Sequence, residues 1–230
     1  MALPALTSAA EDFRGRVQGF ADDASRQIEA ALAGVDPWDV DAVRDALITL
    51  LPVVGGDQHD VAATYAPDWY QLMRGAAGAP GSADPDLAPR PGTARWEALA
   101  RWGVDPLLGL DPDMPAALDR VTGGMQRTIA DGARDTLRLA TVRDPAAEGW
   151  KRLGRGECDF CRMLIGRGAV YTAATATFAS HDRCRCMAAP VFAKGVDPVA
   201  VNDYVGTDRQ LTPEARAANN ARVRAYIQGA

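Results

Sequence analysis

The sequence predicts a mainly α-helical protein: an N-terminal helical body, a small zinc-stabilised β-rich module and a terminal helix. Apolar residues recur every three or four positions over most of residues 1–148, which is typical of amphipathic helices. The helical pattern gives way to short alternating segments after Gly149, and all four cysteines lie in that part of the chain. We therefore expect a helical body over 1–148, a zinc-binding β module over 149–193 and a helical tail over 194–230.

The first predicted element is one amphipathic helix over residues 5–33. Gly34 is expected to end it, and Asp36-Pro37 is typical of an N-cap followed by proline in the first turn of the next helix. The apolar stripe of the first helix consists of Leu6, Ala9, Phe13, Val17, Phe20, Ala24, Ile28 and Leu32.

Two further helices are predicted before the first long loop. The earlier one is expected to stop at Pro52 and Gly55-Gly56, because proline removes a helical hydrogen bond and glycine is a poor helix former. The later one is expected over about 57–77, with a kink or restart at Pro67.

Residues 78–92 contain three glycines and four prolines, a composition that rules out a helix interior and predicts a loop. A short helix is expected around 93–102. A long helix should then begin at Asp111-Pro-Asp-Met-Pro and end at Asp144-Pro145. The pair Gly123-Gly124 within it predicts close approach by another helix, since each glycine costs about 1 kcal/mol relative to alanine.

The segments 150–153, 169–172 and 187–192 fit strands better than helices. A module this small commonly needs a bound metal to stay folded. Its minimal core is expected to consist of Trp150, Val170, Tyr171, Val191 and Phe192.

Five potential zinc ligands lie in this module. Cys158 and Cys161 are separated by two residues, and His181, Cys184 and Cys186 follow about 20 residues later. Thiolate and imidazole are the ligands that structural zinc prefers, and such sites usually hold four of them. Five candidates compete for four places, so a Cys₄ site and a Cys₃His site are both open.

Disulfide, redox and catalytic-metal roles for the cysteines have less support in the sequence. The first residues lack the basic region and the apolar region of a secretory signal. We therefore expect a cytoplasmic protein whose cysteines bind metal rather than form disulfides. No thioredoxin-like context surrounds the Cys-x-x-Cys pair. A catalytic zinc would need an open coordination position and a nearby base such as Asp159 or Asp182, whereas four or five strong ligands indicate a closed structural site.

No other enzyme class is indicated. Ser180 is directly beside His181, a poor arrangement for a catalytic pair, and His59 is expected to lie on a helix surface. The sequence contains no phosphate-binding glycine loop, so no small-molecule substrate is expected. No apolar run reaches the roughly 18 residues that span a bilayer, so no membrane partner is expected either.

Charge is distributed unevenly along the chain. Residues 1–149 hold 13 Arg or Lys against 23 Asp or Glu, a net charge of −10, whereas residues 150–230 hold 12 against 7, a net charge of +5. This suggests contact between the two parts or with a partner. DNA would be one such partner, although the basic patch is sparse for nucleic-acid binding. The arginines that would contact DNA are Arg152, Arg155, Arg162, Arg167, Arg183 and Arg185.

The motifs of residues 149–192 resemble those of the MuF-like minor capsid, or head-morphogenesis, proteins of tailed bacteriophages. The resemblance rests on Gly149-Trp150, on Cys-Asp-Phe-Cys with the downstream Arg167-Gly-Ala-Val-Tyr171, and on His-Asp-Arg-Cys-Arg-Cys with Pro190-Val-Phe192. The form found in phages of actinobacteria is the most similar. Weaker similarity extends back through the helical part to about residue 55.

The resemblance implies a role inside the phage head. Such proteins are structural components present in few copies, often near the portal, and they assemble in the host cytoplasm. The portal and the major capsid protein are the implied partners. Similar actinophage proteins are often labelled capsid maturation proteases, which leaves a protease acting on the major capsid protein as the alternative function.

Overall fold

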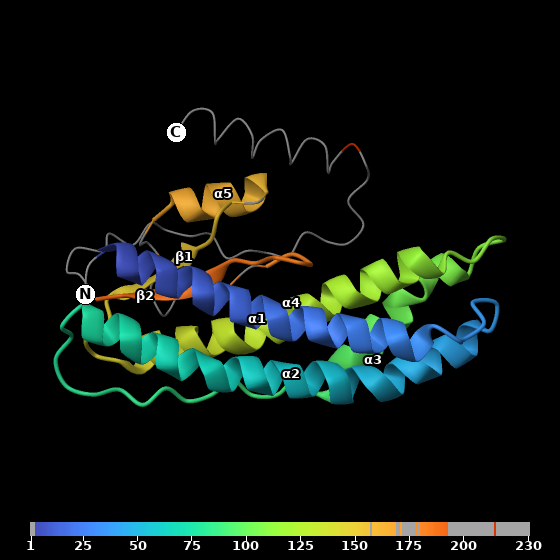
Figure 1. Cartoon of the computed structure of the whole chain (residues 1–230), viewed down its shortest axis with the longest axis horizontal. Helices are drawn as coiled ribbons and strands as arrows, with labels where there is room; N and C mark the ends of the chain where they lie inside the picture. The colour runs from blue at the N-terminus through green and yellow to red at the C-terminus, as the bar shows by residue number, and fades with distance from the viewer. Residues whose placement is uncertain are drawn as a thin grey trace.

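The structure, a computed structural model, describes residues 3–156, 158–168, 171, 178, 180–192 and 214, with side chains from Ser8 onward. Three long helices, α1 (Leu3–Leu32), α2 (Val40–Ala76) and α4 (Met114–Arg143), run alongside one another (Figure 1). The shorter elements are α3 (Thr93–Gly103), the 3₁₀ helix η1 (Asp105–Leu107), β1 (Gly149–Leu153), α5 (Asp159–Gly166) and β2 (Met187–Val191). The predicted fold class, a mainly helical body with a small C-terminal β region, is confirmed.

Helix α1 agrees with the predicted helix over 5–33 to within two residues. Its buried side chains recur at the spacing of one helical face, which packs on α2 and α4. Phe13 stacks on Trp69 of α2 with ring centroids 5.3 Å apart. The buried residues of α1 include Phe13, Val17, Ala21, Ala24, Ile28 and Leu32.

The prediction of two helices between Pro37 and the loop was wrong, because α2 continues unbroken through Pro52 and Pro67. Packing of α2 against α1, α3 and α4 outweighs the roughly 3 kcal/mol that an internal proline costs. The glycines have a packing role instead: a Cβ on Gly55 would lie 2.7 Å from the Trp96 ring of α3. Glycine is therefore required at this contact because it lets α3 approach α2 closely.

The predicted loop over 78–92 and the helix that follows it are confirmed. The loop follows the surface of the bundle and is anchored along its length. The Ala88 N–H donates to Thr136 Oγ1 of α4 at 2.9 Å. Arg90 pairs with Asp57 and Asp60 of α2, at 2.7 Å in each case.

Helix α4 lies at the centre of the fold and contacts α1, α2, α3 and both strands. Its boundaries are as expected, with Asp113 as N-cap. The expected close approach is seen at Gly124, where a Cβ would lie 2.5 Å from Leu99 Cδ1 of α3. The expectation of a surface position for His59 was wrong, because His59 is 3% exposed and its carbonyl lies against Gly132 of α4.

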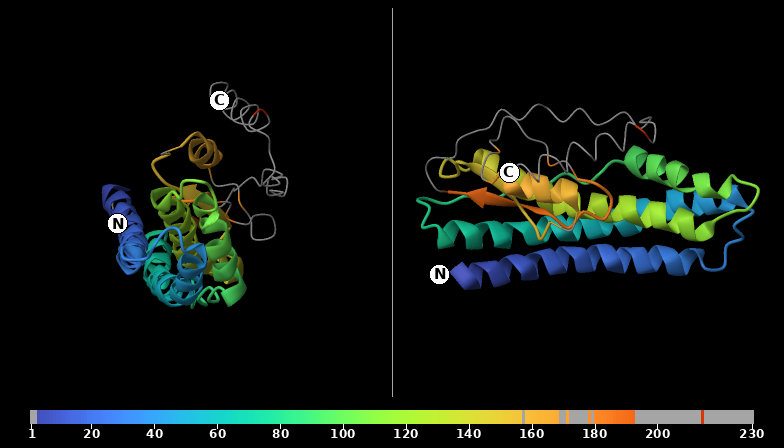
Figure 2. Two further views of the ribbon diagram at one scale, coloured as in Figure 1. Left: turned by 90° about the vertical axis from the view of Figure 1, so that its right-hand side faces the viewer. Right: turned by 90° about the horizontal axis from the view of Figure 1, so that it is seen from above.

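The strands β1 and β2 form an antiparallel pair in which Lys151 lies opposite Ala189. They lie between α4 and α5, as the end-on view in Figure 2 shows. Tyr171 adds a bridge to Trp150, and the two rings stack with centroids 4.4 Å apart. Two of the three predicted strands are thus found, and Tyr171 occupies the place of the third.

Val170 of the expected core and the predicted helical tail over 194–230, apart from Glu214, lie outside the described residues. The Cys-x-x-Cys pair lies at the start of a helix, since Cys161 belongs to α5. Among the described residues, no helix is both long enough and apolar enough to cross a membrane.

Candidate metal centre

The first pair of candidate ligands lies at the start of α5. Cys158 is the N-cap residue, and its Sγ accepts a hydrogen bond from the Cys161 N–H at 3.3 Å. Cys161 is in the first helical turn and is 2% exposed. The Cys-x-x-Cys spacing therefore directs both sulfurs to the same side of the helix start.

His181 approaches the same point from a turn before β2. The turn is closed by the Cys184 N–H, which donates to the His181 carbonyl at 3.1 Å. The Nδ1 atom of His181 lies 2.7 Å from the Asp182 carbonyl oxygen. Since a carbonyl can only accept, Nδ1 carries the hydrogen and Nε2 presents its lone pair. That Nε2 is 3.1 Å from Cys158 Sγ and 3.3 Å from Cys161 Sγ.

The turn itself depends on Arg183, whose φ of 59° is unusual for a residue other than glycine. Its side chain donates to Asp119 of α4, with Nη1 3.2 Å from Oδ2 and Nη2 2.9 Å from the Asp119 carbonyl oxygen. These contacts hold the turn against the helical body and oppose the cost of the left-handed conformation.

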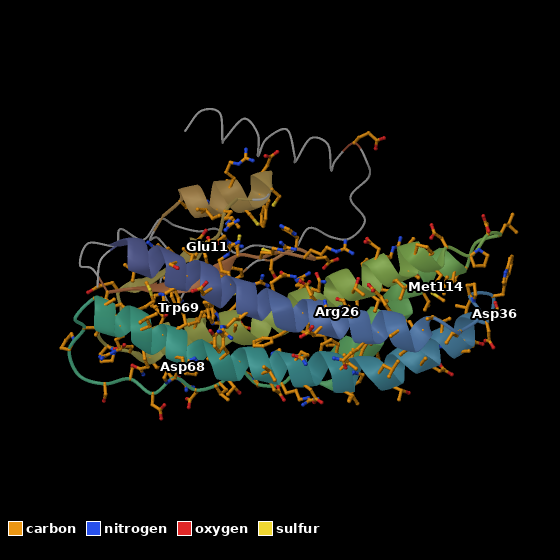
Figure 3. All side chains as sticks on the ribbon, viewed as in Figure 1. Glu11, Arg26, Asp36, Asp68, Trp69 and Met114 are labelled. Atoms are coloured by element: carbon orange, nitrogen blue, oxygen red, sulfur yellow. The ribbon has the colours of Figure 1, made fainter. Side chains whose placement is uncertain are left out.

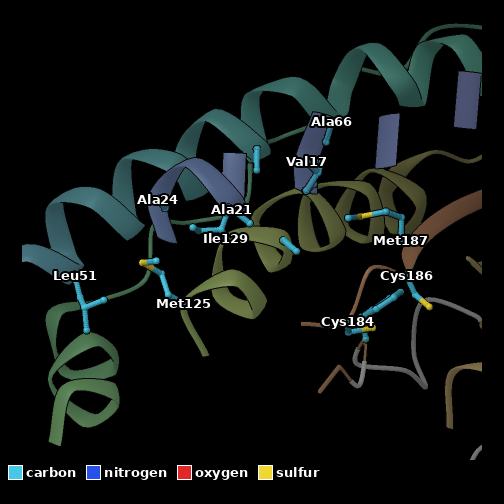
Figure 4. Packing of buried hydrophobic residues seen from close by; sticks show 14 of the residues in the cluster. Val17, Ala21, Ala24, Leu51, Ala66, Met125, Ile129, Cys184, Cys186 and Met187 are labelled. Carbon is cyan, nitrogen blue, oxygen red and sulfur yellow. The ribbon is translucent and has the colours of Figure 1, made fainter. Parts of the chain in front are cut away.

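Cys184 and Cys186 complete the cluster from the start of β2, and both are buried. The donor atoms form two groups, Cys158–Cys161–His181 and Cys161–Cys184–Cys186, and within each group all donor atoms lie within 4.8 Å of one another. Cys161 belongs to both groups. Figure 4 shows Cys184 and Cys186 next to Met187, at the edge of the apolar core.

The closest donor pairs have spacings near those around a tetrahedral zinc ion. Zinc bonds of about 2.3 Å to sulfur and about 2.0 Å to nitrogen put neighbouring ligand atoms about 3.5–3.8 Å apart. Cys161 Sγ is 3.6 Å from Cys184 Sγ, and the two sulfur–nitrogen distances to His181 are slightly shorter than this range. The described residues thus bring all five predicted ligands together, and all five remain candidates for the four places.

Protonation of the buried thiols is uneven without a metal ion. Hydrogen bonding to Cys161 and Cys186, aided by the positive charge of Arg134, lowers the pKa of Cys184 despite its burial. Hydrogen bonding to Cys184 and Cys186, together with burial, raises the pKa of Cys161. Three sulfurs this close cannot all ionise unless a cation compensates their charge, which is what a divalent metal supplies.

Arginines of the helical body hold the backbone around Cys184 and Cys186. Arg134 of α4 is fully buried, and it donates from Nε to the Cys186 carbonyl at 2.8 Å and from Nη2 to the Cys184 carbonyl. Arg14 of α1 donates from Nε to the Arg185 carbonyl at 3.0 Å. Three consecutive carbonyls are therefore bound by side chains from two helices. This links the ligand segment directly to the bundle.

The interpretation of the sequence missed these arginines. One signal was available: Ala130, Arg134 and Leu137 are spaced by four and three residues, so Arg134 falls on the buried face of α4. A charged residue at such a position needs buried partners. Gly154 was not predicted to belong to the site either. The structure shows its role, because a Cβ there would lie 2.7 Å from Cys186 Sγ.

The sequence model of the VG15 protein family matches residues 5–207, which include the helical body and all five candidate ligands. The chain belongs to the VG15 protein family. No curated protein and no solved structure matches the chain. The metal-ligand cluster of this VG15 protein therefore has to be interpreted from its own geometry.

Ser180 and His181, the residues considered for a protease, have different partners in this VG15 protein. Ser180 Oγ donates to Asp131 Oδ1 of α4 at 3.1 Å. His181 is engaged by the Asp182 carbonyl through Nδ1 and faces the cysteines through Nε2. Neither residue is placed to act on the other.

Several arginines of the basic C-terminal part pair with acidic residues of the helical body. Arg155 pairs with Glu11 of α1 at 2.7 Å, and Arg183 pairs with Asp119 of α4. Arg152 is buried and lies over the Phe178 ring, with its guanidinium carbon 3.9 Å from the centroid. Arg162 also pairs with Asp159, at 3.4 Å, so four of the six arginines expected to contact DNA have partners within the molecule.

Proposed function

We propose that this chain is a minor capsid protein of a tailed bacteriophage head, in which a structural zinc ion fastens the segment 181–186 to the helical body. The resemblance of the cysteine motifs to MuF-like head proteins supports the phage-head part of this proposal, and the VG15 family match spans the helical body together with all five candidate ligands. In this proposal the protein lies in the interior of the head, near the portal, and contacts the portal or the major capsid protein.

The main support for a structural role of the zinc ion is the contact of Arg14 and Arg134 with the carbonyls of residues 184–186. The ligand segment contributes few apolar side chains to the core, so its position depends on these bonds and on the metal. A zinc ion would join this segment to α5 through Cys158 and Cys161, and it would provide the charge that lets the buried thiolates coexist. With four or more strong donors, it would have no open position for substrate.

Zinc removal tests this role. A strong chelator should lower the midpoint of thermal unfolding and expose the segment 181–186 to hydrogen exchange, while α1, α2 and α4 remain protected. Re-addition of zinc should restore both. Full protection of that segment after complete removal of the metal would contradict a structural role.

The location is tested separately, on phage particles. Mass spectrometry of purified heads should detect the chain at few copies per head, and a phage lacking its gene should produce defective heads. Presence of the chain only in the infected cell, with normal heads in its absence, would contradict the minor capsid proposal. Contact with packaged DNA would appear as binding that weakens steeply with salt.

A further inference from the structure

Large apolar side chains are exposed at the end of the bundle opposite the metal-ligand cluster. Trp38 lies in the loop between α1 and α2, and Leu108 and Leu110 lie in the segment between α3 and α4. These side chains are 66%, 69% and 101% exposed, respectively. We call this surface the distal tip. Figure 3 shows its two loops at one end through Asp36 and Met114, while Glu11 lies towards the other end.

The two loops of the distal tip border one shared groove. Its volume is about 700 Å³, and its apolar lining consists of Trp38, Val40, Ile48, Val104 and Leu108. Exposure of large apolar side chains to water is unfavourable unless a binding partner covers them. Exposed apolar patches therefore commonly mark binding sites. Exposed tryptophan is a frequent anchor of protein interfaces. The groove therefore has the character of an interaction surface.

The charge around the groove selects the kind of partner. Residues 36–48 and 101–113 contain seven aspartates and two arginines, a net charge of −5. Arg44 is already paired with Asp41 and Asp45, and Arg101 with Glu97. The negative field repels nucleic-acid phosphates and anionic lipids, and it disfavours tip-to-tip association of two copies. A positively charged protein segment is the complementary occupant.

We propose that the distal tip binds a basic amphipathic segment of another protein, which places an apolar side chain in the groove beside Trp38 and its Lys or Arg residues against the surrounding aspartates.

The test uses the full chain and a short labelled helical peptide of leucine and lysine, with the same peptide carrying glutamate in place of lysine as the control. The lysine peptide should bind, should weaken as salt is raised, and should shift the emission of Trp38 to shorter wavelength. Trp38→Ser and the double variant Leu108→Ser, Leu110→Ser should each weaken binding at least tenfold. Leu72→Ser, which removes an exposed leucine of α2 outside the groove, should leave binding unchanged.

Four outcomes would overturn the inference: no binding of the lysine peptide, equal binding of the glutamate peptide, unchanged affinity in the tip variants, or equal weakening in Leu72→Ser. Sedimentation velocity of the chain alone tests whether the groove binds a second copy of the chain instead. If the chain self-associates and the tip variants abolish that association, the distal tip binds a second copy, and the proposed basic partner is wrong.

Discussion

The guanidinium group of Arg134 lies between α4 and the ligand segment, with Nε 2.8 Å from the carbonyl oxygen of Cys186. The same group donates to the Cys184 carbonyl and, from Nη1 at 2.8 Å, to Asp131. Its side chain is fully buried. One residue thus connects the central helix to the backbone that carries two candidate ligands, so stability and metal binding should depend on it together.

Arg134→Ala should lower the free energy of unfolding by about 3 kcal/mol, because it leaves two buried carbonyls without their donor and removes one of the three donors to Asp131. It should also weaken zinc binding, since the ligand segment loses its support. Urea unfolding and zinc competition measure the two effects. Arg138→Ala is the matched control: Arg138 lies one turn further along α4, has a single 3.4 Å pair with Asp135 and should change stability by less than about 1 kcal/mol. Equal losses in both variants would contradict the role of Arg134.

Gly154→Ala should weaken zinc binding at least tenfold, because a Cβ there would lie 2.7 Å from Cys186 Sγ and 3.3 Å from Ile165 Cδ1. Overpacking of this kind typically costs about 1–3 kcal/mol. Gly166→Ala, at the end of α5, meets nothing within 4 Å and should leave affinity unchanged. Competition against a chromophoric chelator gives both affinities, and wild-type affinity of Gly154→Ala would show that Cys186 tolerates displacement.

The buried carboxylate of Asp144 should make stability depend on acid. Burial alone would raise its pKa, but hydrogen bonds from Arg74 Nε at 2.8 Å, the Ala146 N–H and Tyr70 Oη at 3.0 Å lower it below the ordinary value of 3.8. Because the folded pKa is depressed, this stabilisation is fully present well above pH 3.8 and is lost as pH falls through the folded value.

Asp144→Asn should therefore cost about 3 kcal/mol at neutral pH, where Arg74 would be left without its anionic partner. The difference from wild type should shrink as pH falls below 3.8. Urea unfolding of both proteins across this pH range gives the difference in unfolding free energy directly. Effects of acid on the cysteines occur in both proteins and therefore cancel in this difference. A difference that stays constant with pH would show that the charge of Asp144 is not what stabilises the fold.

Cobalt substitution should identify which donors bind. The intensity of the sulfur-to-cobalt charge-transfer band increases with the number of bound thiolates, so each Cys→Ser variant reports whether a thiolate has been lost. Cys158→Ser and Cys161→Ser should each weaken cobalt binding strongly. Of His181→Ala, Cys184→Ser and Cys186→Ser, two should weaken binding as strongly and the third should do so less, which distinguishes a Cys₄ site from a Cys₃His site. Unchanged binding in Cys161→Ser would contradict a shared central ligand.

The helical body was largely predictable because its signals are local. The apolar stripe of α1, the proline-rich loop and the N-cap Asp113 each depend on residues close together in the sequence. Helix α2 was not, because whether Gly55 ends a helix or contacts a ring depends on Trp96, which lies about 40 residues away along the chain. Tertiary packing decided the outcome against local propensity.

The candidate metal centre shows the same limit. Cysteine and histidine spacing was enough to find the five ligands, because ligand chemistry is a property of residue type. The supports of the site could not be found in this way: Arg14 and Arg134 are distant in sequence from the carbonyls that they bind. Helix α5, which Cys158 caps, was not predicted because eight residues carry little periodic signal.

The most direct test is native mass spectrometry of the purified chain, with Cys161→Ser as the comparison. Cys161 is the one residue that both donor groups share. We predict one zinc ion per wild-type chain, and none on Cys161→Ser, with unfolding of the variant at a lower temperature. A wild-type chain that is metal-free and fully folded would contradict a structural zinc site.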